Sequence, residues 1–381
     1  MIWWKTALFV VSAVLLTAAG LGFFLGCMVF SSSGHSGPRS AHFDGKRFRN
    51  RGGESERGLG SLIKWMTNRN RGKWNAYKHY DPGPPPPDRV GTGKLLVTFV
   101  NHSTVLLQTD GVNILTDPVF SDRVGPVSFA GPKRHRPPGI RFEDLPPIDV
   151  VLISHDHYDH LDIPTLKRLR EHSNPLLLAG LGNSALLRRH NLKNSRDLDW
   201  WETFLFRSKD ASTEITFTPA NHFSMRGLRD RNRTLWGSFV VNTPSSRIYF
   251  AGDTGFGPHF EKIGGRFGPF DLALIPIGSF RPRWFMKPNH ISPQEAVSAH
   301  HILGSRFSVG IHFGTFSLAD DGQFEAVREL ERAILQDPRE TLFVTLEFGE
   351  GRWVPLSAVI QGRQTADPAV WAAPIAADRA G

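Results

Sequence analysis

The sequence predicts an α/β protein in which two β-sheets are sandwiched between helices. Short apolar runs of strand length outnumber helical segments in the first half of the chain, and both kinds mix in the second half. The clusters of His and Asp residues each follow a predicted strand, which would gather these side chains along one sheet edge. The 381 residues are enough for one large or two ordinary domains, and an apolar content of 40% supplies an ordinary core.

Turn and capping signals bound the predicted elements. Thr109-Asp110-Gly111 predicts a hairpin turn, and Ser292-Pro293 with Glu295 predicts a capped helix start. The predicted strands are Leu95–Val100, Thr104–Gln108, Val112–Leu115, Ile148–Ile153, Leu176–Ala179, Ile215–Thr218, Ser238–Val241, Arg247–Phe250, Leu272–Ile277 and Phe307–Ile311, with a final sheet edge from Thr341–Phe348 and Trp353–Val359. The predicted helices are Ile163–Glu171, Pro293–Leu303 and Gly322–Leu335.

The N-terminal region predicts a transmembrane helix. Thr6–Phe30 is a stretch of 25 residues without a charge, longer than the roughly 20 apolar residues that cross a bilayer. Trp3 and Trp4 stand where interfacial aromatic residues belong. We therefore expect a single-pass, membrane-anchored protein, with a lipoprotein signal ending at Cys27 as the alternative.

A basic tether is expected between this anchor and the catalytic domain. Residues 31–73 hold ten Lys and Arg against three Asp and Glu, and a basic excess beside a membrane span indicates anionic lipid as the partner. The same excess favours the cytoplasmic side for the catalytic domain. The expected divisions are an anchor over 1–30, a basic and Pro-rich tether over 31–93, a catalytic domain over 94–362 and a loose C-terminal tail over 363–381.

The most informative run is Ser154-His155-Asp156-His157-Tyr158-Asp159-His160, which directly follows the apolar strand Val150–Ile153. Imidazole and carboxylate groups at such close spacing are the ligands that zinc prefers. The chain has a single cysteine, Cys27, so a cysteine-built zinc site is excluded. A polar loop that is His-rich by chance is the alternative reading.

Four later residues look like companions of this run. His222, Asp253 and His312 each follow a predicted strand, and His290 stands just before a predicted helix. Each of them alone would be an ordinary polar residue at a strand end. Together they form one pattern, in which a strand is followed by a ligand type, and the pattern indicates a metal site.

The run from His155 to His160 resembles the His-x-His-x-Asp-His signature of the metallo-β-lactamase superfamily. The resemblance narrows to the phospholipases D that hydrolyse N-acylphosphatidylethanolamine and to their bacterial relatives. The segments that carry it are Thr116–Phe120, Gly131–Arg134, Leu145–Asp149, Leu235–Ser238, Arg283–Lys287 and His312–Phe316. It implies an αβ/βα sandwich with two zinc ions. The implied ligands are His155, His157 and His222 for one ion, Asp159, His160 and His312 for the other, and Asp253 as a bridge.

The resemblance implies a zinc-dependent phosphodiesterase of the phospholipase D type. A hydroxide shared by two zinc ions would attack phosphorus and release an N-acylethanolamine and phosphatidic acid. Asp253 and His290 are the expected catalytic residues, and a plain helix-start role is the alternative for His290. Asp156 could orient an imidazole, whereas Asp162 is expected to cap the following helix. The basic and aromatic residues of 281–287 suit an anionic headgroup, with a solvated loop as the alternative.

Other function classes compete with the lipid phosphodiesterase. One is a nuclease or lactonase of the same fold, and another is a membrane-tethered, non-catalytic binding module. The intact ligand set argues against the module, and a lactonase needs no membrane attachment. The densest basic excess lies beside the predicted anchor, so no nucleic-acid partner is expected. The expected partners are a phospholipid substrate and a membrane, and the oligomeric state is left open, with a homodimer as one alternative.

Overall fold

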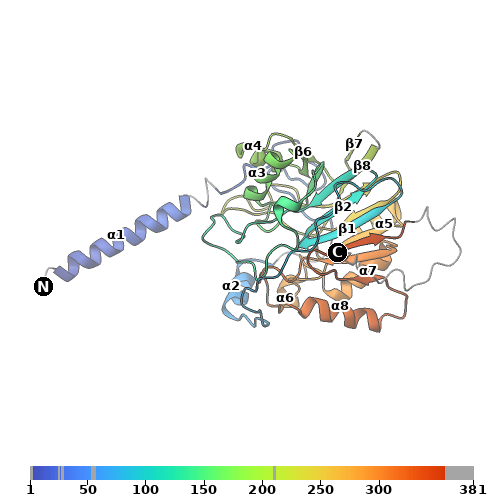
Figure 1. The fold of residues 1–381 in the computed structure, drawn as a ribbon. Coiled ribbons are helices and arrows are strands. Elements are labelled where there is room, and N and C mark those ends of the chain that lie inside the picture. Colours follow the sequence, from blue (N-terminus) through green and yellow to red (C-terminus); the bar gives the residue numbers. More distant parts are fainter. Residues whose placement is uncertain (1–2, 25, 27–29, 53–56, 209–211, 357–381) are drawn as a thin grey trace.

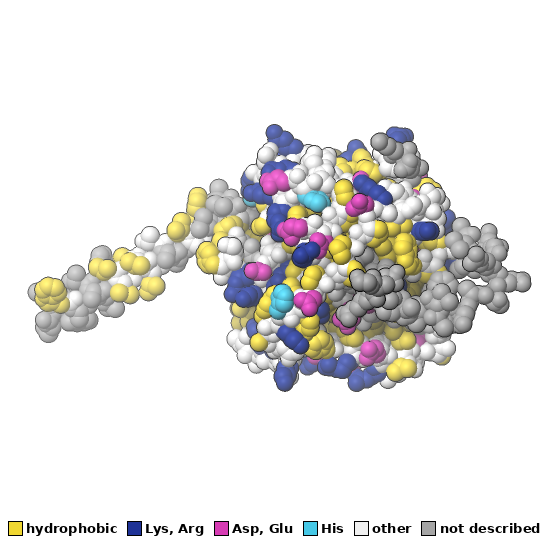
Figure 2. All heavy atoms as spheres, viewed as in Figure 1, with side chains coloured by type: hydrophobic (Ala, Val, Ile, Leu, Met, Phe, Trp, Pro, Cys, Tyr) yellow, Lys and Arg dark blue, Asp and Glu magenta, His cyan; other side chains and the backbone are white. Residues whose placement is uncertain are grey.

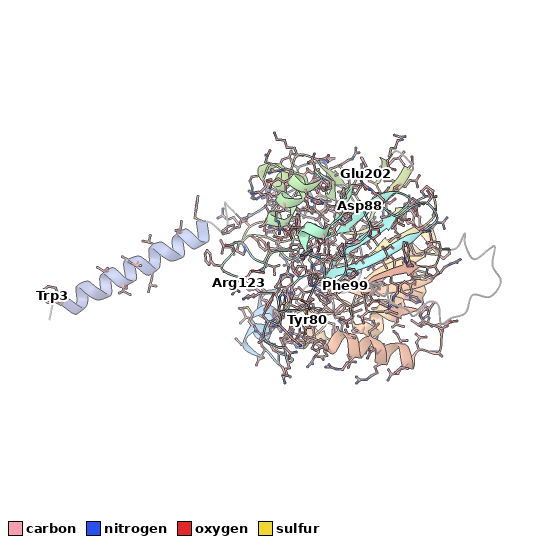
Figure 3. All side chains as sticks on the ribbon, viewed as in Figure 1. Trp3, Tyr80, Asp88, Phe99, Arg123 and Glu202 are labelled. Atoms are coloured by element: carbon pink, nitrogen blue, oxygen red, sulfur yellow. The ribbon has the colours of Figure 1, made fainter. Side chains whose placement is uncertain are left out.

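The structure, a computed structural model, describes residues 3–24, 26, 30–52, 57–208 and 212–356. Within them, two seven-stranded sheets lie face to face and helices cover the outer faces (Figure 1). The main hydrophobic core lies between the sheets and takes side chains from both. Phe99 belongs to this interior (Figure 3), where its ring stacks on Phe313 at 5.2 Å between centroids. The predicted α/β class with two sheets between helices is confirmed.

The first sheet is antiparallel on one side and parallel on the other. Asp110 and Gly111 join two of its strands, and both have a positive φ, as a tight hairpin turn requires. In spatial order its strands are β14 (Gly351–Val354), β1 (Leu95–Asn101), β2 (Thr104–Thr109), β3 (Val112–Thr116), β4 (Val150–Ile153), β5 (Leu176–Gly180) and β6 (Ser195–Leu198).

The second sheet is mixed in the same way. In spatial order its strands are β13 (Phe343–Val344), β12 (Phe307–Ile311), β11 (Leu272–Pro276), β10 (Arg247–Phe250), β9 (Ser238–Asn242), β8 (Ser212–Thr218) and β7 (Thr203–Arg207). The parallel strands β10 to β12 end at one sheet edge, so the loops that follow them start close together.

Helices complete the two outer layers. The first sheet is covered by α3 (Ile163–His172) and α4 (Asn183–Arg189), and the second by α5 (His259–Phe267), α7 (Pro293–Ile302) and α8 (Glu325–Gln336). The predicted cap of α7 is present, because the Ser292 side chain accepts from the Glu295 backbone and the Glu295 side chain accepts in return. The remaining elements are α1 (Trp3–Phe24), α2 (Leu59–Thr67), the 3-10 helix η2 (Phe142–Asp144) and α6 (Arg283–Met286).

Several elements differ from the sequence prediction. The sequence did not predict α4, α5, β6 and β7. The expected final sheet edge is divided, because β13 pairs with the second sheet and β14 with the first. A short strand pairs with whichever edge its neighbours bring to it, which local sequence does not encode. Cys27 and residues 357–381, which include the predicted tail, lie outside the described residues.

The predicted membrane span requires a correction. In the described part of the chain, no helix combines the length and the apolarity that are needed to cross a membrane. A span needs one helix of sufficient apolar length, which a count of uncharged residues does not establish. This finding contradicts the predicted transmembrane helix and the single-pass membrane localisation.

Candidate metal centre

The seven predicted metal ligands meet at one edge of the two sheets. The run from His155 to His160 follows β4, and His222 follows β8 by four residues. Asp253 and His312 follow the parallel strands β10 and β12. Because these strands end side by side, Asp159 and His312, about 150 positions apart in the chain, lie within contact distance.

Three imidazoles form the first group. The His157 Nδ1 lies 2.9 Å from His155 Nε2 and 3.3 Å from His222 Nε2. Burial, together with neighbouring histidines, lowers the pKa of His155 and His222 well below the usual value, and burial lowers the pKa of His157 to about 3. All three rings are therefore neutral near pH 7, the form in which imidazole binds a metal.

Asp159, His160 and His312 form the second group. The Asp159 Oδ2 lies 3.3 Å from His160 Nε2 and 3.6 Å from His312 Nε2. Asp253 stands between the two groups. Its Oδ2 is 3.1 Å from His312 Nε2, 3.4 Å from His160 Nε2 and 3.8 Å from His222 Nε2, so the carboxylate reaches both groups at once.

Unpartnered atoms in the centre fit metal ions. Among the described residues, His160 Nε2, His312 Nε2 and Asp253 Oδ1 are buried without a hydrogen-bond partner. Buried polar atoms are normally hydrogen-bonded, so unpartnered atoms on residues of one His and Asp cluster fit a bound metal ion. Imidazoles and carboxylates are a suitable donor set for a divalent metal.

Hydrogen bonds fix the orientation of the imidazoles. Asp117, which follows β3, lies 2.6 Å from His160 Nδ1 through its Oδ2 and also accepts from the Ser154 backbone and hydroxyl. The His222 Nδ1 donates to the Asn289 carbonyl at 3.0 Å, which leaves the Nε2 lone pair facing the centre. Such partners set the tautomer of metal-binding histidines.

The structure adds His102, which the sequence reasoning missed. Its Nε2 lies 2.9 Å from Asp159 Oδ2, and the ring is buried beside His312 at 4.1 Å between centroids. It could hold a metal together with Asp159, His160 and His312. The available signal was similar to that for His312, because His102 stands two residues after the predicted strand Leu95–Val100.

Asp156 and Asp162, which flank the metal ligands in the sequence, have other hydrogen-bond partners than the sequence predicted. Asp156 accepts from the Met225 backbone and the Thr234 hydroxyl, so it supports the neighbouring loop and orients no imidazole. Asp162 occupies the capping position of α3, but its side chain makes no hydrogen bond to the helix backbone. It accepts instead from Ser121 and Thr165, and the expected capping bond is therefore absent.

A cavity of about 590 Å³ opens at the metal-ligand groups. His290 lines it, and the His290 Nδ1 lies 3.7 Å from Asp253 Oδ2. Burial lowers the pKa of His290 to about 4, so the ring is a neutral hydrogen-bonding group. The other walls are mostly apolar, with two arginines among them: Arg57, Leu59, Leu62, Trp65, Phe223, Met225, Arg231, Phe285, Met286 and Leu318.

The basic and aromatic segment 281–287 was expected to contact the substrate, and only part of it lies at the cavity. Phe285 and Met286 line the cavity. Arg283 forms a salt bridge with Glu295 at 2.8 Å, and Arg281 pairs with Glu325. These two guanidinium groups thus form ion pairs with residues of α7 and α8. Their contacts do not support the expectation that they bind an anionic headgroup.

Comparisons with known proteins agree with this geometry. The family model described as a beta-lactamase superfamily domain matches residues 112–313. An N-acyl-phosphatidylethanolamine-hydrolyzing phospholipase D 1 of Caenorhabditis elegans is 41% identical over 267 residues, which is 67% of this chain and 75% of that protein. A mitochondrial N-acyl-phosphatidylethanolamine-hydrolyzing phospholipase D of Saccharomyces cerevisiae is 36% identical, over 61% of this chain and half of its own length.

Solved structures show the same fold. Igni18, a metallo hydrolase from Ignicoccus hospitalis, is 20% identical, with a TM-score of 0.51 over 68% of this chain and 98% of its own. An isothiocyanate hydrolase from Delia radicum gut bacteria is also 20% identical, with a TM-score of 0.53 over 67% of this chain and 98% of its own. The resemblance inferred from the sequence motifs is confirmed.

Proposed function

The chain belongs to the metallo-β-lactamase superfamily and is a metal-dependent hydrolase, and from this premise we propose that it is a dizinc phosphodiesterase of the phospholipase D type. The proposed substrate is N-acylphosphatidylethanolamine, and the proposed products are an N-acylethanolamine and phosphatidic acid. In this proposal His155, His157 and His222 would hold one zinc, and Asp159, His160 and His312 would hold the other. Asp253 would supply its carboxylate to both.

The apolar cavity is the observation that carries this proposal. It brings the ligand groups of the centre, together with His290, to the base of a space of about 590 Å³ whose walls are mainly aliphatic and aromatic. Such a space suits a substrate with long acyl chains, since apolar walls stabilise a buried chain by about 25 cal/mol per Å². The relatives named above act on a lipid of this kind by name.

The residues have distinct roles in the proposed reaction. Two bound zinc ions would supply a water of lowered pKa and would polarise a phosphoryl oxygen. His290 contacts the phosphate or the leaving oxygen through its ring. Phe223, Met225 and Phe285 hold an acyl chain and exclude bulk water from the reacting phosphorus. Asn289 and Asp117 keep two imidazoles in the tautomer that faces the centre.

The alternatives have less support. A nuclease needs a basic surface to meet a run of phosphates. On the face in Figure 2, Lys and Arg side chains are interspersed with Asp and Glu and with apolar side chains. A lactonase does not require a large apolar cavity. A non-catalytic module does not require converging, unpartnered donor atoms in the centre.

A direct comparison of substrates tests the proposal. The zinc-loaded protein would be incubated with N-acylphosphatidylethanolamine, a sugar lactone and RNA, and the products would be identified by mass spectrometry. We expect an N-acylethanolamine and phosphatidic acid from the lipid and little turnover of the others. Asp253→Asn is the inactive control. Hydrolysis of the lactone or the RNA with the lipid left intact would refute the lipid assignment.

A further inference from the structure

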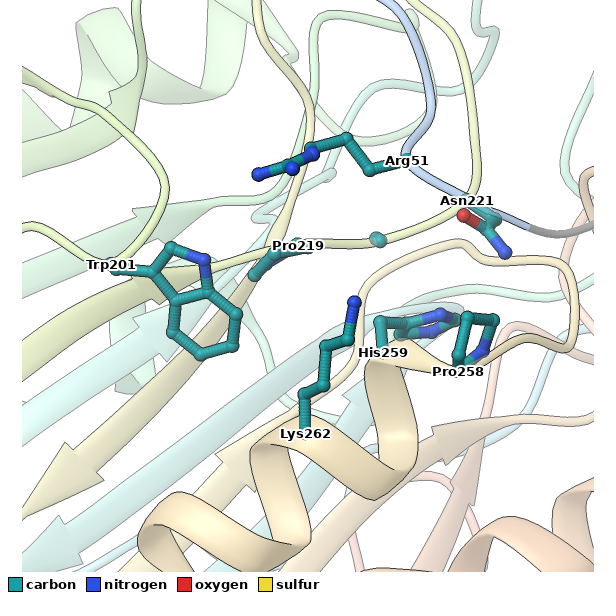
Figure 4. A pocket seen from close by; sticks show the side chains of 8 residues that line it. Arg51, Trp201, Pro219, Asn221, Pro258, His259 and Lys262 are labelled. Carbon is teal, nitrogen blue, oxygen red and sulfur yellow. The ribbon is translucent and has the colours of Figure 1, made fainter. Parts of the chain in front are cut away.

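A second, smaller cavity lies next to the loops that carry the metal ligands. Its volume is about 50 Å³, and it shares no lining residue with the large cavity. Its walls come from the N-terminal segment, from Trp201, from the strand end before His222 and from the start of α5 (Figure 4). Nothing in the proposed phosphodiesterase reaction uses it.

The charge of this cavity is positive. Arg51 from the N-terminal segment and Lys262 from α5 both line it, and no carboxylate does. In the part of the chain that the structure describes, neither cation forms a salt bridge with an Asp or Glu side chain. The N-terminal end of α5, which begins at His259, adds its partial positive charge on the same side.

A buried imidazole faces the same space without a full set of partners. His259 is 5% exposed and lines the cavity. Its Nε2 lies 3.1 Å from the Thr254 hydroxyl, whereas its Nδ1 has no hydrogen-bond partner among the described residues. A buried nitrogen normally has a hydrogen-bond partner, so this atom is suited to contact a bound ligand. The Thr254 hydroxyl donates to the Gly255 carbonyl at 2.8 Å, so the His259 Nε2 carries the ring proton and donates to Thr254. The unprotonated Nδ1 is therefore an acceptor, which can receive a hydrogen bond from a protonated oxygen of a bound anion.

We propose that this cavity binds a small oxyanion of the size of inorganic phosphate, held by Arg51 and Lys262, with a protonated oxygen of the anion donating to His259 Nδ1. Guanidinium and ammonium groups form their strongest hydrogen bonds with oxyanions. The space accepts only a few water-sized groups, since one water needs about 10–15 Å³, and this excludes a ligand with an apolar tail. Asn221 and Thr254 adjoin the metal ligands His222 and Asp253, so the bound anion sits against both ligand loops.

Titration with inorganic phosphate tests this site. The probe is added to the full-length, zinc-loaded protein, and binding is followed by calorimetry and by thermal shift. We expect Lys262→Gln and Arg51→Gln each to weaken this binding at least about tenfold, which corresponds to about 1.4 kcal/mol. Both side chains are exposed, so the variants should fold. Lys193→Gln, an exposed lysine elsewhere, is the matched control and should bind as wild type.

Two further arms separate this site from other sources of binding. His157→Ala disrupts the metal centre and should leave phosphate binding at the small cavity intact. Glycerol 3-phosphate should bind more weakly than inorganic phosphate because its carbon chain does not fit. Unchanged affinity in both Lys262→Gln and Arg51→Gln, or complete loss in His157→Ala, would overturn the proposal. If glycerol 3-phosphate bound as tightly as inorganic phosphate, or more tightly, the assignment of the cavity to a free oxyanion would be overturned.

Discussion

The His102 Nε2 lies 2.9 Å from the Asp159 Oδ2, within the same buried cluster as His160 and His312. His102 follows β1 in the first sheet, whereas His312 follows β12 in the second. The second ligand group is therefore held by residues from both sheets, and the position of Asp159 depends on how the two sheets pack.

The first prediction concerns this contact. His102→Ala should weaken binding of one of the two zinc ions by about 10- to 100-fold, the usual cost of losing a residue that orients a ligand. Zinc competition with a coloured chelator measures the affinity directly, without reference to turnover. His102→Gln can restore a hydrogen bond to Asp159 and should recover part of the affinity. Full affinity in His102→Ala would show that Asp159 is positioned without it.

The second prediction concerns the metals themselves. Chelation should abolish hydrolysis, and elemental analysis of the active protein should give about two zinc ions per chain. Asp253→Asn should lower turnover at least about 100-fold, because it removes a charged ligand and not merely an orienting partner. Circular dichroism checks that the variant is folded. A metal-free protein that retains activity would contradict the proposed centre.

The third prediction concerns the cavity wall. Trp65 on α2 stacks on Phe285 of α6, with 4.9 Å between ring centroids and 16° between planes. Trp65→Ala should raise KM for a long-chain N-acylphosphatidylethanolamine about tenfold, or about 1.4 kcal/mol, with a smaller effect on a short-chain analogue. Trp353→Ala, which alters an exposed ring on β14, is the control. An equal effect on both chain lengths would mean that this wall does not contact the acyl chain.

The fourth prediction concerns the pH dependence of stability. Burial raises the pKa of Asp321 from its ordinary 3.8 to about 6, although its Oδ2 accepts a hydrogen bond from the Ser279 backbone. Between these two values the folded protein retains a proton that the unfolded chain has lost. The contribution of Asp321 to stability therefore falls as the pH rises from about 4 to about 6 and then levels off.

Asp321→Asn should remove this loss of stability. The rise in pKa corresponds to about 3 kcal/mol, so the variant should be more stable than wild type at pH 7 by up to that amount. The two proteins should be equally stable near pH 4. Urea unfolding at both pH values measures the difference, and a wild type that is the more stable protein at pH 7 would contradict the argument.

The sequence by itself determined the fold class, the family and the spacing of the ligand run. A strand followed by His155-Asp156-His157-Tyr158-Asp159-His160 is a local pattern. Such a pattern can be recognised in one sequence without any knowledge of how the chain packs. The cap of α7 and the hairpin at Asp110-Gly111 were predictable for the same reason. The apolar N-terminal stretch was local too, but its count of uncharged residues did not establish a membrane-spanning helix.

Tertiary structure alone decided which residues meet. The contact between His102 and Asp159, and the place of Asp253 between two ligand groups, arise where strands from two sheets end beside one another. The salt bridges of Arg281 and Arg283 depend equally on how α7 and α8 pack. Such contacts join distant parts of the chain, and their energies depend on burial and geometry, which no short segment of the sequence contains.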